Sequence, residues 1–333
     1  MNELQRIEFD MLKEVVRVCS ELKLTYYLVC GSALGAIKYR GFIPWDDDTD
    51  IALPRRDYEI FIKEAQALLP ENLFLQNYHT EPSFPQIFSK LRNSETTYIE
   101  KSVSKLPVNH GVYIDIFPLD EYPSERAEQK KLERKKTKQY LKLSVAYCSK
   151  KTGRAALFGF FGKLFHYDRK IRVNVEKLED ALTRYKGPRS DILCNHGNWQ
   201  GNLEYAPREQ YGNGKIATFE GLSVRVPEKY DEYLTQKYGD WRAELPQEQQ
   251  VGHHYAEVID LTRPYTDYIE KLTDGKIRIK RNEEISQKLS PRLFFVLPCC
   301  SDFCPFPRRR ITKNLFLKRM MCSKAHPQPL RPA

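Results

Sequence analysis

The sequence lacks any run of about 20 apolar residues, the length that a membrane-spanning helix needs. It also lacks an Asn-x-Ser/Thr sequon, and its first ten residues are polar and acidic, unlike a secretory signal peptide. These absences disfavour an integral membrane protein and a secreted protein. We therefore expect a cytoplasmic protein that contacts at most the inner face of a membrane.

Most of the chain also lacks a net charge. The sequence has 54 Lys and Arg against 44 Asp and Glu, a net charge of +10. From Arg263 onward there are 16 basic and 6 acidic residues, so residues 1–262 carry 38 of each. A nucleic-acid-binding domain concentrates basic charge on its own surface. The neutral main part therefore predicts no nucleic-acid partner.

The cysteines lack the regular spacing of a zinc site or of a disulfide framework. Four of the eight are scattered through residues 1–262, and the other four lie between residues 299 and 322. We expect the scattered cysteines to be reduced and structural.

Hydrophobic periodicity predicts alternating helices and strands. Helices are expected at 3–22, 55–69, 124–147 and 150–185, with one or two helical turns at 33–39. Strands are expected at 26–30, 48–53, 73–76, 87–92, 96–100 and 112–117, the last between Gly111 and Pro118. This order indicates an α/β (α+β) protein with a small mixed sheet and helices packed around it.

The character of the sequence changes near residue 262. Beyond it the chain is basic, rich in proline and without periodicity. We predict a catalytic domain over 1–262 and a poorly ordered appendage over 263–333.

An acidic cluster precedes the strand expected at 48–53. In an extended chain Asp46, Asp48 and Asp50 point to one face, and Asp47 points to the other. Like charges on one face repel, and bound divalent cations remove that cost. Carboxylate oxygens suit Mg²⁺ or Mn²⁺. The alternative is a solvated acidic turn, whereas an EF-hand is disfavoured because its Gly and closing Glu are missing.

Asp115 is a single charge within the apolar strand expected at 112–117. A buried carboxylate needs a cation or a basic partner. Asp115 is therefore either a third metal ligand beside Asp48 and Asp50, or the partner in a structural salt bridge, for which Arg92 is the candidate.

Gly31 and Ser32 lie between a predicted strand and a short helix. Glycine lets a phosphate approach the backbone, the serine hydroxyl donates a hydrogen bond, and a helix N-terminus favours anions. Together with the Asp-x-Asp pair and Asp115, this is the set of groups that metal-assisted phosphoryl or nucleotidyl transfer uses.

These segments resemble the LicD family. The resemblance spans roughly residues 5–262 and rests on 31–35 (GSALG), 40–51 (RGFIPWDDDTDI), 113–120 (YIDIFPLD), 219–221 (FEG), 226–227 (VP), 238–241 (YGDW) and 245–246 (LP). It implies a nucleotidyltransferase-like fold and a divalent-metal-dependent phosphotransferase. Family members transfer phosphocholine or, in the fukutin-related branch, ribitol phosphate, from a CDP-linked donor to a sugar.

The resemblance implies roles for individual residues. Asp48 and Asp50 are the paired ligands of Mg²⁺ or Mn²⁺, and Asp115 is the third carboxylate. Gly31 and Ser32 contact the donor phosphates. Asp46 acts on the acceptor side or supports the metal ligands.

Further candidates for substrate binding are basic residues. Lys38, Arg40 and Arg92 could neutralise the donor diphosphate, with Lys90 beside Arg92. Each is equally compatible with a surface salt bridge. His253 follows the 238–241 motif and is expected either on the substrate side or in a structural histidine pair with His254.

The expected reaction transfers an alcohol phosphate to a glycan or glycolipid acceptor of lipopolysaccharide or teichoic acid type. An alternative enzyme would form the CDP-alcohol, and another would carry ribitol or glycerol phosphate. A non-enzymatic alternative is a basic protein that binds a membrane surface. Membrane contact is expected through the apolar segment 155–165, which basic residues flank, or through the basic tail.

Overall fold

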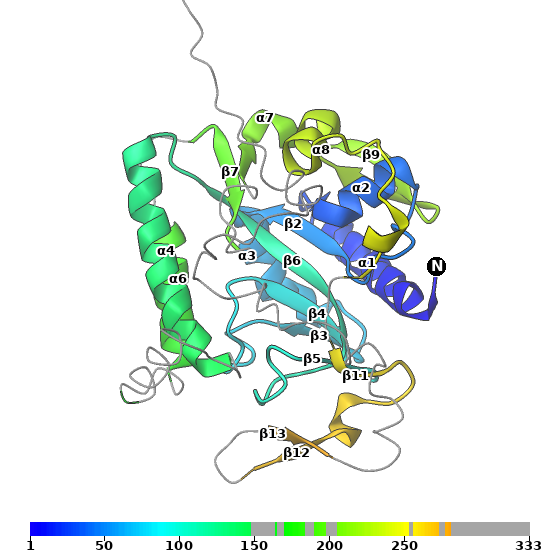
Figure 1. Cartoon of the computed structure of the whole chain (residues 1–333), viewed down its shortest axis with the longest axis vertical. Helices are drawn as coiled ribbons and strands as arrows, with labels where there is room; N and C mark the ends of the chain where they lie inside the picture. Colours follow the sequence, from blue (N-terminus) through cyan, green and yellow to red (C-terminus); the bar gives the residue numbers. More distant parts are fainter. Residues whose placement is uncertain are drawn as a thin grey trace, which may run out of the picture.

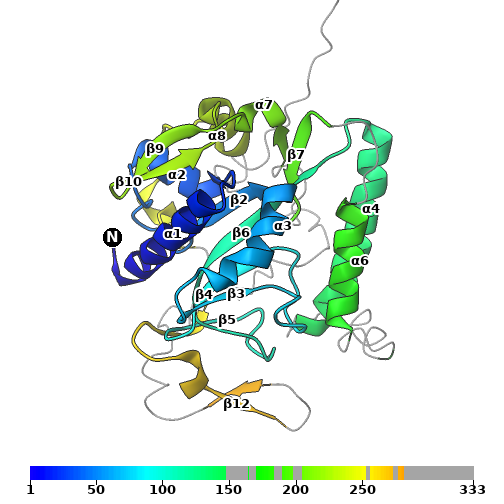
Figure 2. The same cartoon turned by 180° about the vertical axis from the view of Figure 1, so that it is seen from behind.

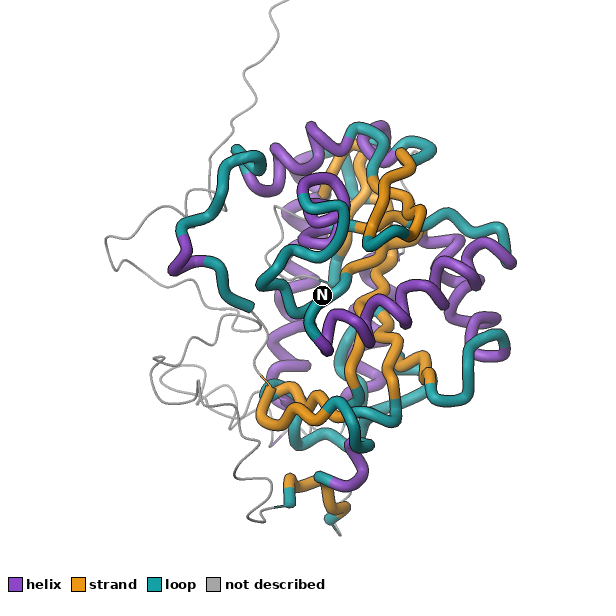
Figure 3. The backbone as a smooth tube through the Cα atoms, turned by 90° about the vertical axis from the view of Figure 1, so that its right-hand side faces the viewer, coloured by secondary structure: helices purple, strands orange, loops and turns teal. Residues whose placement is uncertain are grey.

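A mixed sheet with helices on both sides forms the centre of the molecule (Figure 1). The computed structural model describes residues 1–147, 164, 170–183, 190–197, 205–252, 256–272 and 277–280. Figure 3 shows the strands in the middle with helices to either side. The α/β (α+β) architecture expected from the sequence is confirmed.

The main sheet has seven strands in the order β1-β2-β6-β4-β3, with β7 paired to the second half of β6 and β8 paired to β7. The strands are β1 (Tyr27–Leu28), β2 (Asp50–Pro54), β3 (Leu73–Gln76), β4 (Ser89–Asn93), β6 (Val112–Glu121), β7 (Ile192–Asn195) and β8 (Tyr205–Pro207). Only β2 and β6 run parallel in this sheet. Both lie at its centre, so Asp50 at the start of β2 lies beside Asp115, the fourth residue of β6.

Strand β6 continues beyond Pro118, where we expected it to end. On one side its partner is β4 up to Ile116, and from Leu119 onward its partner is β7. Pro118 lies between these two ladders, so its missing N–H costs neither of them a hydrogen bond. This exchange of partners, which sequence does not reveal, allows β6 to run through the proline.

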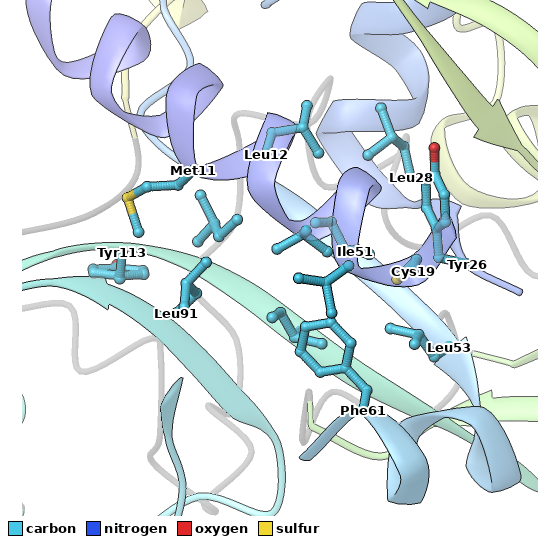
Figure 4. Packing of buried hydrophobic residues seen from close by; sticks show 14 of the residues in the cluster. Met11, Leu12, Cys19, Tyr26, Leu28, Ile51, Leu53, Phe61, Leu91 and Tyr113 are labelled. Atoms are coloured by element: carbon cyan, nitrogen blue, oxygen red, sulfur yellow. The ribbon is translucent and has the colours of Figure 1, made fainter. Parts of the chain in front are cut away.

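Helices α1 (Glu3–Glu21) and α3 (Arg55–Glu64), the latter extended by the 3₁₀ turn η1 (Ala65–Ala67), cover one face of the sheet (Figure 2). Met11 and Leu12 from α1 and Phe61 from α3 pack against Ile51 and Leu91 of the strands (Figure 4). Burying each such side chain stabilises the fold by about 1.5–3 kcal/mol. This core fixes the orientation of β2 and β6.

Alternate residues of the same strands point to the opposite face. There Ala52 and Phe117 pack with Tyr233 and Leu234. This face is covered by α2 (Cys30–Lys38), α7 (Arg208–Tyr211) and α8 (Tyr230–Tyr238). The hairpin of β9 (Lys215–Phe219) and β10 (Leu222–Val226) instead packs into the core on the α1 side. Helix α2 begins earlier than expected, so Gly31 and Ser32 lie in its first turn and not in a loop before it.

Two helices, α4 (Arg126–Tyr147) and α6 (Ile171–Thr183), pack side by side on the side of the sheet away from α1 and α2 (Figures 1 and 2). The remainder of the helix expected at 150–185 lies almost entirely outside the described residues. Within the described part of the chain, no helix has the length and hydropathy needed to cross a bilayer.

The described residues after 246 add short elements, several of which lie beside β5 and its flanking residues. They are η3 (Gln247–Gln249), β11 (Ala256–Asp260), η4 (Tyr265–Asp267), β12 (Ile269–Lys271) and β13 (Ile277–Ile279), and β11 pairs with β5 (Thr97–Glu100). The Tyr265 amide donates to the Thr96 carbonyl at 3.0 Å. The domain boundary at residue 262 stays a prediction, and residues 281–333 lie outside the described part of the chain.

Candidate functional site

Three charged residues form a row across the centre of the sheet. Asp50 of β2 is the register neighbour of Asp115 of β6, and Asp115 is the register neighbour of Lys90 of β4. Register neighbours point to the same face of a sheet. All three therefore project to the face opposite α1 and α3. The two aspartates that the sequence predicted to act together are adjacent.

The row is buried and only partly neutralised. Lys90 Nζ lies 3.0 Å from Asp115 Oδ1 and 3.2 Å from Glu100 Oε1, so one ammonium serves two carboxylates. Burial raises the pKa of Asp115, and Lys90 offsets part of that rise. Burial raises the pKa of Asp50 well above its usual range, and the charges of Asp48 and Asp115 raise it further.

The acidic loop lies immediately before this row. Carboxylate oxygens of Asp46, Asp47 and Asp48 lie within 4.8 Å of one another. The expectation that Asp47 points away from Asp46 and Asp48 is wrong. Regular structure begins only at Asp50, and a loop has no alternation of faces. Asp46, Asp47 and Asp48 therefore form one half-buried group beside Asp50.

Helix α1 holds this loop in place. Gln5 Nε2 donates to the Ile43 carbonyl at 3.2 Å and to the Asp46 carbonyl at 3.0 Å. Thr49 Oγ1 donates to Glu8 Oε2 at 3.2 Å, and both residues are buried. Burial raises the pKa of Glu8, and the charge of Asp48 adds to the rise. Glu8 is thus a further carboxyl of the site.

The first turn of α2 faces the same loop. The Asp50 amide donates to Ser32 Oγ at 2.8 Å, which ties the start of β2 to α2. A Cβ on Gly31 would lie 2.7 Å from Asp46 Oδ2, so only glycine permits this approach without displacement. Within the described chain, the amides of Gly31 and Ser32 have no acceptor, as is normal for the first turn of a helix.

Helix α8 and the segment before residue 253 lie next to the acidic residues. Lys237 of α8 is buried, and its charge opposes the rise in the pKa of Asp50, which burial dominates. The Cys30 amide donates to Tyr233 Oη at 3.1 Å, which joins α8 to α2. A Cβ on Gly252 would lie 2.4 Å from Asp47 Oδ2. His253 follows Gly252 but lies outside the described residues.

The other basic candidates occupy different surroundings. Lys38 lies at the end of α2, where its Nζ donates to the Ala243 carbonyl at 2.8 Å and pairs with Glu244 at 3.1 Å. Arg40 is exposed, with a left-handed φ of 57°, and its carbonyl accepts from the Glu220 amide at 2.8 Å.

Arg92 is fully buried and its guanidinium is occupied. It donates to Gln76 Oε1 at 2.8 Å, to the Gly111 carbonyl at 2.8 Å and to Glu100 Oε2 at 2.6 Å. The salt bridge that we considered between Arg92 and Asp115 is therefore not the one that forms, because Lys90 lies opposite Asp115. The substrate role of Arg92 stays a prediction.

Two residues near the site, Glu8 and Lys237, were not selected from the sequence. Glu8 follows Leu4 by four positions and precedes Met11 by three, so it lies on the apolar face of α1. A charge on that face is a recognisable signal. Lys237 carries no comparable signal, because its approach to Asp50 depends on the packing of α8 against α2.

The donor set can accommodate a divalent cation. Asp50 is more than nine-tenths buried, and no donor among the described residues hydrogen-bonds to its carboxylate. An uncompensated carboxylate of this kind fits a hard cation with oxygen ligands. Asp48 and Asp115 lie near enough to influence its pKa.

Adjacent aspartates on a small mixed sheet, next to a Gly-Ser helix start, are the architecture of nucleotidyltransferase-like enzymes. Residues 23–146 match a family model described as LicD/FKTN/FKRP, nucleotidyltransferase domain. The resemblance to the LicD family is thereby confirmed for residues 23–146, which are similar to the nucleotidyltransferase domain of that family.

Two relatives extend this comparison. The chain is 28% identical over 273 residues to the lipopolysaccharide cholinephosphotransferase LicD of Haemophilus influenzae, which covers 77% of this chain and 97% of that protein. It is 27% identical over 115 residues to an uncharacterized protein of Rickettsia prowazekii, covering 34% of this chain and 40% of that protein. Both the family model and the Haemophilus influenzae relative support a phosphotransferase enzyme.

Proposed function

We propose that this protein transfers phosphocholine, or a related alcohol phosphate, from a CDP-linked donor to a sugar of a cell-surface glycan. The observation that carries the proposal is the adjacency of Asp50 and Asp115 beside Gly31 and Ser32. This arrangement combines carboxylates for cations with amides for phosphate. Similarity to the Haemophilus influenzae enzyme supports choline as the alcohol and lipopolysaccharide as the acceptor.

Asp48, Asp50 and Asp115 would hold Mg²⁺ or Mn²⁺. Such a cation, when bound, neutralises charge on the donor diphosphate and on the leaving phosphate. The amides of Gly31 and Ser32, at the start of α2, would bind the donor phosphates. Lys237 would supply a buried positive charge on the opposite wall.

In the proposed reaction a sugar hydroxyl oxygen attacks the phosphorus that carries choline. The bond between that phosphorus and the oxygen it shares with CMP breaks, and CMP leaves. The hydroxyl proton passes to a base. Asp46, which lies against Gly31, is the candidate to orient the hydroxyl and accept this proton. The product is the phosphocholine-substituted sugar.

The test compares CDP-choline, CDP-ribitol and CDP-glycerol as donors, with Mg²⁺ and a lipopolysaccharide acceptor. We expect CMP release coupled to labelling of the acceptor by CDP-choline. Asp48→Asn and Asp50→Asn should abolish both, and Asp10→Asn, an exposed aspartate of α1, should change neither. Full activity in Asp48→Asn and Asp50→Asn would refute the metal assignment.

Two alternatives within the enzyme class have distinct products. Formation of a CDP-alcohol would release pyrophosphate from CTP and would not label a glycan. Transfer of ribitol or glycerol phosphate would appear as a preference for the corresponding CDP donor. A teichoic acid acceptor would be identified by labelling of that polymer in place of lipopolysaccharide.

A further inference from the structure

Helix α4 carries the most one-sided charge among the described elements. Its 22 residues contain eight Lys or Arg and two Glu. Residues 1–262 are neutral in sum, so this excess is balanced elsewhere in the domain. The net charge of the domain conceals a strongly basic helix.

The basic residues occupy the face of α4 that points away from the protein. Leu132, Tyr140 and Leu143 are buried against Val175 and Leu178 of α6. At 100° per residue, the opposite face of α4 holds five exposed basic side chains, which we call the α4 basic face: Lys130, Lys131, Arg134, Lys135 and Lys138. The two Glu residues of the helix lie outside this arc.

The α4 basic face is not neutralised by its surroundings. Lys131 has one exposed contact with Glu128 at 3.6 Å. Lys130, Arg134 and Lys138 form no ion pair with any described residue. They follow one another at four-residue intervals, so neighbouring like charges repel along the helix. A ligand with distributed negative charge would remove this repulsion.

The positive charges near α4 also affect one another electrostatically. Partial burial lowers the pKa of the Lys142 ammonium, and the charges of Lys138 and Lys177 lower it further. Lys177 belongs to α6, so the positive potential extends from α4 onto the adjacent helix. An isolated solvated charge would not produce this mutual effect.

We propose that the α4 basic face binds an anionic membrane surface. Lysine ammonium groups spaced along a straight helix suit a planar layer of lipid headgroups, and each contributes to attraction within a Debye length of the surface. The face is lysine-rich and has no exposed aromatic side chain on which a nucleic-acid base could stack. Both features favour lipid over nucleic acid.

The sequence around α4 agrees with this choice. Residues 155–165, which follow α4 in the chain, are AALFGFFGKLF, with basic residues on both sides. A basic segment followed in the sequence by an apolar one is typical of proteins at membrane interfaces. The acidic loop is hydrogen-bonded to α1 and α2. These two helices lie on the side of the sheet away from α4 (Figures 1 and 2). An anionic bilayer would attract the α4 basic face and repel the side of the molecule that carries the acidic loop.

The test is co-sedimentation of the full chain with vesicles of phosphatidylcholine alone, or of phosphatidylcholine with about 30% phosphatidylglycerol. We expect binding to the anionic vesicles only, and a loss of binding as salt is raised from about 50 to 500 mM. Combined Lys130→Glu, Arg134→Glu and Lys138→Glu should weaken binding at least tenfold. Thermal unfolding of this variant should change little, because the three Glu side chains repel one another at the same spacing as the cations they replace but gain attraction to Lys131 and Lys135.

The matched control reverses the charge of three exposed residues on α1 and α3 and changes the net charge by the same amount. Its substitutions are Lys13→Glu, Arg56→Glu and Lys63→Glu. It should retain most of the vesicle binding. Wild-type binding by the α4 variant, or equal losses in both variants, would overturn the proposal. The proposal would also be overturned if the α4 variant lost more of its binding to a DNA duplex than of its binding to anionic vesicles. Activity toward a soluble acceptor should be unchanged in both, which separates this inference from the proposed reaction.

Discussion

Strand β6 carries two buried aspartates in opposite electrostatic surroundings. Asp120 receives two hydrogen bonds from the Arg55 guanidinium, at 2.6 and 2.8 Å, which neutralise both of its oxygens. Asp115 shares the single ammonium of Lys90 with Glu100, and Asp50 beside it has no hydrogen-bond donor among the described residues. The two regions are built from the same strand and the same core.

This difference distinguishes a structural charge from a functional one. Burying a carboxylate costs free energy unless it is paired. At Asp120 the fold supplies the partner. At Asp50 and Asp115, burial raises the pKa values of both groups, and the fold supplies further carboxylates that raise them more. A site that is unfavourable without a ligand is a candidate to bind one.

The largest expected effect is on catalysis. Asp50→Asn should lower the rate of CMP release by about a thousandfold, because it removes the carboxylate that is central to the site. It should not lower the melting temperature, since it removes an uncompensated buried charge. Turnover and thermal unfolding measured on the same preparation test both statements. A parallel loss of activity and stability would mean that Asp50 is a structural residue.

At the other end of β6 we expect the opposite: a substitution that lowers stability and leaves activity nearly unchanged. Asp120→Asn leaves Arg55 with Glu179 at 2.8 Å and Glu59 at 3.0 Å but removes its bidentate partner. We expect a loss of about 2–3 kcal/mol in the free energy of unfolding, measured with denaturant. The turnover number per folded molecule should change less than twofold.

Arg55→Lys is the control for this prediction. It keeps the charge but loses the fork that holds both oxygens of Asp120. It should cost less than Asp120→Asn. If Asp120→Asn were as stable as wild type, or inactive while folded, the contrast between the two ends of β6 would not hold.

Much of the fold and part of the site could be predicted from the sequence, but the pairing of Asp120 with Arg55 could not. The strand at 73–76 and the helix at 3–22 match the structure to within a residue, because turn residues and a regular apolar face mark them. The proximity of Asp50 to Asp115 followed from the motifs. Each of these inferences depends on a local pattern.

The partner of Asp115 could not be predicted in the same way. Lys90 and Arg92 are two residues apart, so both point to the same face of β4. Only the register of β4 against β6 places Lys90 opposite Asp115 and Arg92 opposite Tyr113. Register and helix packing depend on contacts between distant segments, which also explains why Lys237 was missed.

Cation binding should have a smaller effect on stability. Mg²⁺ at about ten times its dissociation constant should stabilise the wild-type protein by about 1.4 kcal/mol, because it binds only the folded site. The measurement is the melting temperature in Mg²⁺ against a chelator. Asp50→Asn should show little of this shift, and Asp120→Asn should show all of it. Equal shifts in the three proteins would place the cation elsewhere.

The smallest effect concerns pH. Because the folded-state pKa of Asp50 is raised, this residue favours folding when protonated, and that contribution is lost as pH rises through its folded pKa. Asp50→Asn has no such titration. In cation-free buffer its stability advantage over wild type should be larger at neutral than at acid pH, and should shrink as the pH falls toward the unfolded-state pKa of about 3.9.

Two buried histidines do not affect the difference in pH dependence between the wild type and Asp50→Asn. Burial lowers the pKa of His110 to about 4 and that of His196 to about 3, so both disfavour the fold as pH falls below about 6.5. Both are present in the wild type and in Asp50→Asn, so their contribution cancels in the difference between the two melting temperatures. Asp10→Asn should show no pH-dependent difference. An advantage of Asp50→Asn that grows toward acid pH would mean that Asp50 is stabilised as a carboxylate, and the contrast with Asp120 would be lost.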